Sequence, residues 1–147
     1  MHRSLIALLI FIQTLAVQAE VIHIDTTEFA RLLAARVPVI DVRTAPEWRE
    51  SGIIPGSHLL TYFDQQGNAN PSAWLEKVKT IATPKQPIIL ICRSGNRTRA
   101  VSHFLSTDGG YATVYAVKGG ILAWSKDGRP LLPMNQNTAS CPAGQRC

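Results

Sequence analysis

The segment 88–91, Ile-Ile-Leu-Ile, constrains the fold of this 147-residue chain more than any other segment. Side chains of a strand point alternately to its two faces, so a strand that is apolar at every position is buried on both. Such a strand belongs in the centre of a parallel sheet that is covered by helices on each side. The chain is long enough to close a core of this kind without disulfide or metal support.

Strand and helix patterns alternate along the rest of the chain. Strands are expected at 21–24, 37–42, 58–60 and 112–117, where apolar or β-branched residues cluster. Helices are expected after Asp25 up to Arg36, from Pro71 to Ile81, from about Ala100 to Leu105, and from Gly119-Gly120 through Trp124. We therefore predict an α/β fold with a central, mainly parallel sheet of about five strands and helices on both faces.

The amino-terminal residues have the pattern of a secretory signal peptide. Arg3 precedes an apolar run from Leu5 to Ile12, and Val17-Gln18-Ala19 offers the small residues that a signal peptidase requires. Residues 1–19 are therefore predicted to be removed, which places the product in the periplasm or otherwise outside the cytoplasm, without stable membrane insertion. An uncleaved membrane anchor is the alternative, although polar residues interrupt the apolar run.

The residues that carry chemistry follow the central strand directly. Cys92 begins a loop at the carboxyl end of this strand, which is where ligands bind in open parallel sheets. Because the loop contains Gly95 and closes onto a helix start, several backbone N–H groups can turn inward and the helix dipole adds partial positive charge. Arg93, Arg97 and Arg99 add three cations. The loop thus favours a thiolate and combines a sulfur nucleophile with a cradle for an anion.

The composition and the residues of the loop argue against several other interpretations of this site. A buried structural cysteine beside solvated arginines is the plain alternative, but cysteine, glycine and three arginines coincide within eight residues. The net charge of +5 favours anionic ligands in general, and no aromatic–basic interleaving indicates a nucleic-acid partner. Three cysteines are too few for a disulfide scaffold, and their spacing does not match a zinc site.

Three segments resemble the rhodanese, or thiosulfate sulfurtransferase, family. The loop 92–97, Cys-Arg-Ser-Gly-Asn-Arg, is similar to the family's active-site loop. Asp41-Val42-Arg43, continuing through Glu47-Trp48 to 52–57, is similar to its first motif, and 119–124 is similar to its second.

The order of these segments indicates one rhodanese domain over residues 20–132, of a single-domain, exported type. Ile53 and Ser57 depart from the family pattern, which often has His and Ala there, but both lie away from the loop. The resemblance implies a rhodanese-like α/β fold and sulfurtransferase activity.

The implied reaction makes Cys92 the catalytic nucleophile. Its thiolate attacks the outer sulfur of thiosulfate or a related small anionic donor, and sulfite leaves a persulfide behind. Cyanide or a thiol acceptor then removes the sulfur, and no metal or organic cofactor is expected. Substrate binding is expected from Arg93, Ser94, Gly95, Asn96, Arg97 and Thr98.

Individual roles follow from side-chain chemistry. Arg97 is expected to hold the loop and the anion, because its planar fork suits an oxyanion. Arg93 and Asn96 are expected at the entrance, and Thr98 is expected to cap the following helix or contact the substrate. Asp41 and Arg43 end a strand on the same side as the loop; a structural ion pair is favoured over a role in lining the pocket.

Two other functions compete with sulfur transfer. Cysteine-based phosphatases, or an arsenate reductase, place the arginine one residue later than Arg97, in a wider loop suited to a phosphoryl group. A non-catalytic rhodanese-like binding module is the other alternative, but such modules lack the cysteine that this chain has at position 92.

Residues 133–147 are predicted to be a flexible, polar tail. Cys141 and Cys147 lie in this tail, and we expect a disulfide between them in an oxidising compartment. The alternative is that one of them resolves the persulfide on Cys92 and so relays the sulfur.

Overall fold

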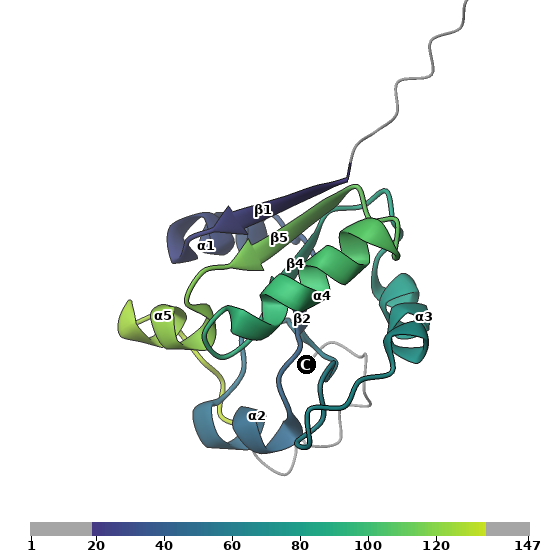
Figure 1. Ribbon diagram of the computed structural model, residues 1–147. Helices are drawn as coiled ribbons and strands as arrows, with labels where there is room; N and C mark the ends of the chain where they lie inside the picture. Colours follow the sequence, from purple (N-terminus) through teal and green to yellow (C-terminus); the bar gives the residue numbers. More distant parts are fainter. Residues whose placement is uncertain (1–18, 135–147) are drawn as a thin grey trace, which may run out of the picture.

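Five parallel strands form one sheet, in the order β1-β5-β4-β2-β3, in the computed structural model, which describes residues 19–134 (Figure 1). The strands are β1 (Glu20–Ile24), β2 (Val39–Asp41), β3 (His58–Leu59), β4 (Ile88–Ile91) and β5 (Thr113–Val117). The predicted parallel sheet of about five strands is confirmed, and β4 lies in its centre as expected.

Helices cover both faces of this sheet. They are α1 (Thr26–Ala34), α2 (Ala45–Ser51), α3 (Pro71–Ile81), α4 (Asn96–Thr107) and α5 (Gly120–Lys126). Helices α3 and α4 pack on one face and α1 and α5 on the other, while α2 packs beside β3 at one end (Figure 1). The structure therefore has the predicted three layers.

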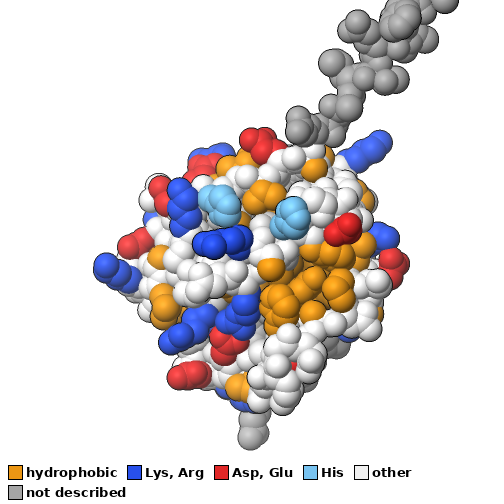
Figure 2. All heavy atoms as spheres, viewed as in Figure 1, with side chains coloured by type: hydrophobic (Ala, Val, Ile, Leu, Met, Phe, Trp, Pro, Cys, Tyr) orange, Lys and Arg blue, Asp and Glu red, His pale blue; other side chains and the backbone are white. Residues whose placement is uncertain are grey.

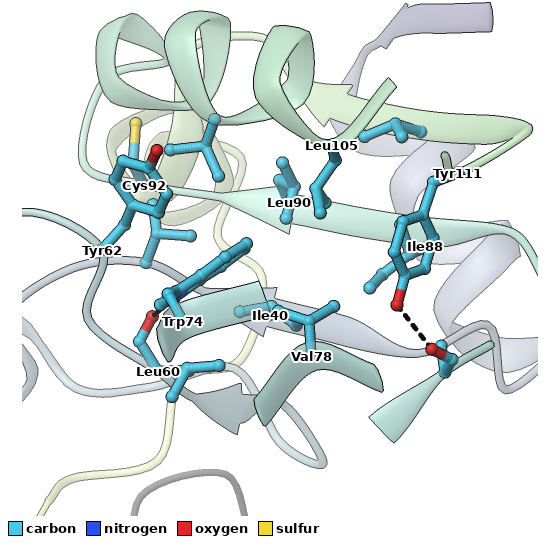
Figure 3. Packing of buried hydrophobic residues seen from close by; sticks show 14 residues of the cluster. Ile40, Leu60, Tyr62, Trp74, Val78, Ile88, Leu90, Cys92, Leu105 and Tyr111 are labelled. Atoms are coloured by element: carbon cyan, nitrogen blue, oxygen red, sulfur yellow. Dashed lines mark hydrogen bonds between the residues drawn. The ribbon is translucent and has the colours of Figure 1, made fainter. Parts of the chain in front are cut away.

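Strand β4 supplies core residues to both faces. Ile88 and Leu90 join the cluster under α3 and α4, which also contains Cys92 (Figure 3). Ile89 and Ile91 point the other way, into the cluster under α1 and α5. All four side chains of the strand are completely buried, which is the physical reason for its unbroken apolar sequence.

Local signals start the first and third helices where the sequence predicts them. The Asp25 side chain accepts a hydrogen bond from the Glu28 backbone N–H at 2.9 Å, and Asn70 accepts one from Ala73 at 3.1 Å. Both bonds satisfy amides that have no partner within the helix.

Two helices differ from the sequence expectation. Helix α2 was not expected as a helix, although Thr44 and Glu47 form a capping box, with the Thr44 N–H 3.0 Å from the Glu47 carboxylate. Helix α4 begins at Asn96, four residues before the expected start at Ala100. The sequence pattern missed this first turn because it is polar and lacks the apolar periodicity that marks the rest of the helix.

A buried ion pair joins β2 to the end of α2. Arg43 and Asp41 are almost completely buried, and their side chains meet at 2.7 Å. The same guanidinium donates to the Ser51 hydroxyl at 2.6 Å and to the Gly52 carbonyl at 2.8 Å. The expected structural ion pair is therefore confirmed, and its second function is to hold the carboxyl end of α2.

The predicted signal peptide and tail fall largely outside this description. Residues 1–18, Cys141 and Cys147 lie beyond the described range, so the proposed cleavage and disulfide stay predictions. Within residues 19–134, no helix has the length and apolar content needed to cross a membrane.

Replacing Asp41 with Asn should be strongly destabilising, because it leaves the buried Arg43 charge without its counter-ion. We expect a loss of about 3 kcal/mol in the free energy of unfolding, measured by urea denaturation. Glu28→Gln is the matched control, because Glu28 pairs with Arg31 at the exposed surface, and it should leave the unfolding midpoint unchanged. Equal effects of the two substitutions would contradict this role for the buried pair.

Candidate active site

Cys92 lies at the carboxyl edge of the sheet, directly after β4 and four residues before α4 begins. Its side chain is 1% exposed. Gly95 caps α4 with a φ of 93°, a left-handed conformation that favours glycine, and its backbone N–H donates to the Cys92 Sγ at 3.1 Å. The sulfur therefore receives a backbone hydrogen bond at the positive end of a helix.

Helix α5 determines which way the peptide groups of the loop face. The Ile121 N–H donates to the Cys92 carbonyl at 2.9 Å, and the Leu122 N–H donates to the Arg93 carbonyl at 3.1 Å. In a trans peptide the N–H points opposite to the C=O, and no peptide bond of the described chain is cis. The N–H groups of Arg93 and Ser94 therefore point away from α5.

This contact requires glycine at position 120. The residue has a φ of 55°, and a Cβ there would overlap the Cys92 carbonyl oxygen and come within 2.6 Å of the Arg93 carbonyl oxygen. Those two oxygens are the acceptors for the first turn of α5, so any larger residue would push the helix away from the loop. Gly120 thus acts on the candidate active-site loop although it lies 27 residues beyond Arg93 in the chain.

Arg97 is paired with Glu47 of α2. Its two terminal nitrogens lie 2.7 and 2.5 Å from the Glu47 carboxylate oxygens, a two-pronged contact between partly buried groups. This hydrogen bonding to Arg97, helped by donation from Thr44, lowers the pKa of Glu47 to about 2. The same carboxylate raises the pKa of Arg97.

The pairing changes the role that Arg97 can be given. The guanidinium fork that sequence reasoning assigned to the anion is engaged by Glu47, so Arg97 anchors the loop to α2. Its contact with a bound anion stays a prediction. Glu47 is a residue of the candidate site that sequence reasoning missed. The sequence placed it within a motif, but nothing there shows that a residue 50 positions away is its partner.

Thr98 lies at the third position of α4 and is buried beside the sulfur. Its hydroxyl donates to the Gly95 carbonyl at 2.9 Å and is 3.9 Å from the Cys92 Sγ. The prediction that Thr98 caps the helix is wrong, because Gly95 occupies the cap position. Thr98 instead links the loop backbone to the surroundings of the sulfur.

The remaining loop residues face outward. Arg93, Ser94 and Asn96 are exposed, which is compatible with the predicted place of Arg93 and Asn96 at the entrance. Arg93 also lines a hollow of about 270 Å³ together with Glu50 of α2 and Leu122 of α5. Within residues 19–134, no group of His, Cys, Asp or Glu side chains is arranged to hold a metal ion.

Tyr62 is a further neighbour of Cys92 that the sequence did not indicate. Both residues belong to one core cluster, and Figure 3 shows the phenol ring beside the cysteine. Tyr62 packs edge-on against Trp74 at 4.9 Å and Phe63 at 4.8 Å, and burial raises the pKa of its phenol. Phe104 packs against the same cluster. Apolar side chains gather between α3 and α4 on the face drawn in Figure 2.

Comparison with known proteins gives a consistent result. Residues 25–127 match the family model described as "Rhodanese-like domain". The chain is 30% identical over 118 residues to Thiosulfate sulfurtransferase 18 of Arabidopsis thaliana, covering 76% of this chain and 84% of that protein. It is also 30% identical over 103 residues to Thiosulfate sulfurtransferase GlpE of Pseudoalteromonas translucida, covering 69% and 87% of the two chains.

A solved structure extends the likeness to three dimensions. The crystal structure of a rhodanese-related protein from Thermoplasma volcanium superposes with a TM-score of 0.60 at 28% identity. The match covers 77% of this chain and 99% of that one. The likeness therefore extends over nearly the whole of that protein.

Gly120→Ala tests the contact between α5 and the loop. The added Cβ must displace the Cys92 and Arg93 carbonyls, so we expect at least a tenfold loss in the rate of Cys92 alkylation by iodoacetamide and a lower melting temperature. Gly67→Ala is the matched control, since Gly67 also has a positive φ, of 83°, but a Cβ there meets no atom within 4 Å. If both variants react as the wild type does, α5 does not set the loop geometry.

Glu47→Gln tests the ion pair through its pH dependence. The folded-state pKa of about 2 lies below the ordinary 4.5, so the stabilisation by Glu47 is present above pH 4.5 and lost as the pH falls towards 2. The substitution should therefore cost about 1–2 kcal/mol at pH 7, measured by urea unfolding, and much less near pH 2. Glu50→Gln, an exposed change on the same helix, should show no such trend. A loss independent of pH would argue against the pairing.

Proposed function

Because this chain belongs to the rhodanese-like domain family, we propose that it is a sulfurtransferase that carries the transferred sulfur on Cys92. The observation that carries the proposal is the hydrogen bond from the Gly95 N–H to the Cys92 Sγ, inside a loop whose carbonyls are held by α5. Two relatives at 30% identity bear the name thiosulfate sulfurtransferase, which supports thiosulfate as the donor.

The reaction has two displacements at sulfur. The Cys92 thiolate attacks the outer sulfur of thiosulfate, an S–S bond forms, and the old S–S bond breaks as sulfite leaves with its electron pair. The enzyme then holds a persulfide. Cyanide or a thiolate attacks the outer sulfur of this persulfide, and the Cys92 thiolate leaves, so that thiocyanate or an acceptor persulfide is formed.

The loop backbone stabilises the charge that moves through these steps. Negative charge is present on the attacking thiolate, on the donor and on the terminal sulfur of the persulfide. The Gly95 N–H donates to the sulfur, and the N–H groups of Arg93 and Ser94 point away from α5, on the side opposite the carbonyls that α5 holds. Fixed amide donors of this kind stabilise an anion without rearrangement during the reaction.

The ion pair between Arg97 and Glu47 holds the loop and its amides in position relative to α2. It joins the first turn of α4 to α2, whose other end is held by the buried Arg43. The Thr98 hydroxyl lies 3.9 Å from the sulfur, and the Tyr62 ring lies beside the cysteine (Figure 3). A small anion fits this site better than a phosphate monoester, because the loop is short and its arginine is engaged by a carboxylate.

We also propose that the reaction takes place outside the cytoplasm. The support is the sequence of residues 1–19, where Arg3 precedes an apolar run and a small residue stands at position 19. In such a compartment the donor or a reducing partner must keep Cys92 out of unwanted disulfides, and its 1% exposure helps to protect it.

Intact mass spectrometry after thiosulfate treatment tests the proposal. We expect the wild-type protein to gain one sulfur atom and to lose it again when cyanide is added, with thiocyanate released. Cys92→Ser should gain no sulfur and should reduce thiocyanate formation to the uncatalysed rate, because it lacks the thiolate. Far-UV circular dichroism of the variant controls for folding.

Two results would contradict this function. A Cys92→Ser variant that turns over thiosulfate as the wild type does would remove the proposed nucleophile. Cysteine-dependent hydrolysis of p-nitrophenyl phosphate, without sulfur loading from thiosulfate or polysulfide, would instead assign the loop to phosphoryl chemistry.

A further inference from the structure

A separate hollow of about 490 Å³ lies at the opposite edge of the sheet from Cys92. Val37 and Pro38, which precede β2, line it, as does His58 at the start of β3, so it is located at the amino ends of these strands. Cys92 follows β4 at the carboxyl edge. The volume is within the range of small-molecule sites, and its position separates it from the sulfur-transfer chemistry.

The lining is apolar with a basic rim. Leu33 of α1, Val37 and Trp124 of α5 are among its apolar side chains. Arg36 and Arg129 contribute cations, and none of the described residues that line the hollow is acidic. A ligand held here would therefore meet an apolar wall and positive charge together.

Arg129 is poorly neutralised. Its guanidinium carbon lies 5.2 Å from the centre of the Trp124 ring, so the cation rests on an aromatic face. Its Nε is buried and has no hydrogen-bond partner among the described residues, and its contact with the Thr27 hydroxyl is long, at 3.4 Å. The long contact leaves the terminal nitrogens of Arg129, which lines the hollow, weakly bonded, so an added anion could accept hydrogen bonds from them.

We propose that this hollow binds an organic anion with an aromatic or aliphatic body and a carboxylate or sulfonate head. The body packs against Trp124 and Leu33, and the head accepts hydrogen bonds from Arg129 and Arg36. The proposal does not depend on sulfur transfer, because no residue of the active-site loop lines the hollow.

Fluorescence titration of the full chain with two probes tests the site. One probe is 8-anilinonaphthalene-1-sulfonate, and the other is N-phenyl-1-naphthylamine, which has the same aromatic body without the sulfonate. We expect Arg129→Gln to weaken binding of the sulfonate about tenfold and to leave the neutral probe nearly unaffected. Arg49→Gln removes the same charge from the surface of α2, outside the hollow, and should change neither probe.

A filling variant tests the location. Ala34→Trp places a large side chain in the hollow from an exposed position on α1, so it should abolish binding of both probes while the circular dichroism spectrum stays native. The Trp124 indole resonance should shift on titration, while those of Trp48 and Trp74 should not.

Three outcomes would overturn the proposal. Equal sulfonate affinity in the wild type and in Arg129→Gln would remove the anion head from the assignment. Binding unaffected by Ala34→Trp would place the probes elsewhere. Sulfonate binding that appears only when residues 135–147 are deleted would make that segment the occupant.

Discussion

The candidate active site depends on two hydrogen bonds from the first turn of α5 to the loop after β4. They bind the carbonyls of Cys92 and Arg93, and because a peptide group is planar and trans, they also direct the following N–H groups to the other side. Parallel pairing of β5 with β4 brings α5 to this position. Gly120 is required because the two backbones approach too closely for any side chain.

The electrostatic character of the site follows from which charges are already paired. Arg43 is neutralised by Asp41, and Arg97 by Glu47, so these two arginines position helix α2 and the loop. The sulfur itself accepts a hydrogen bond from the Gly95 backbone N–H at the amino-terminal end of α4, where the helix dipole adds partial positive charge. Amides are small and fixed, so the site suits a sulfur anion near the backbone. A site that bound its anion through long, mobile side chains would suit a larger ligand better.

The sequence predicts the fold well where local physical signals are strong. The apolar run of β4, the capping residues Asp25 and Asn70, and the order of strands and helices predicted the correct layers and a mainly parallel sheet, which is parallel at every described strand pair. Short or polar elements were less visible: α2 has only seven residues, and the first turn of α4 has no apolar periodicity. For the site, the loop could be located from the sequence.

Its partners could not be located in this way. The contacts of Arg97 with Glu47, and of Tyr62 with the cluster around the cysteine, join residues that are far apart in the chain. Side-chain chemistry predicted a bound substrate anion as the partner of Arg97. Only the fold shows that the Glu47 carboxylate pairs with this arginine.

A crystal structure of the thiosulfate-treated protein tests the account most directly. The account predicts one additional sulfur atom bonded to the Cys92 Sγ, within hydrogen-bond distance of the amide nitrogens of the loop, with the carbonyls of Cys92 and Arg93 still bound to α5. An unmodified Cys92, or an added sulfur directed away from these amides, would contradict it.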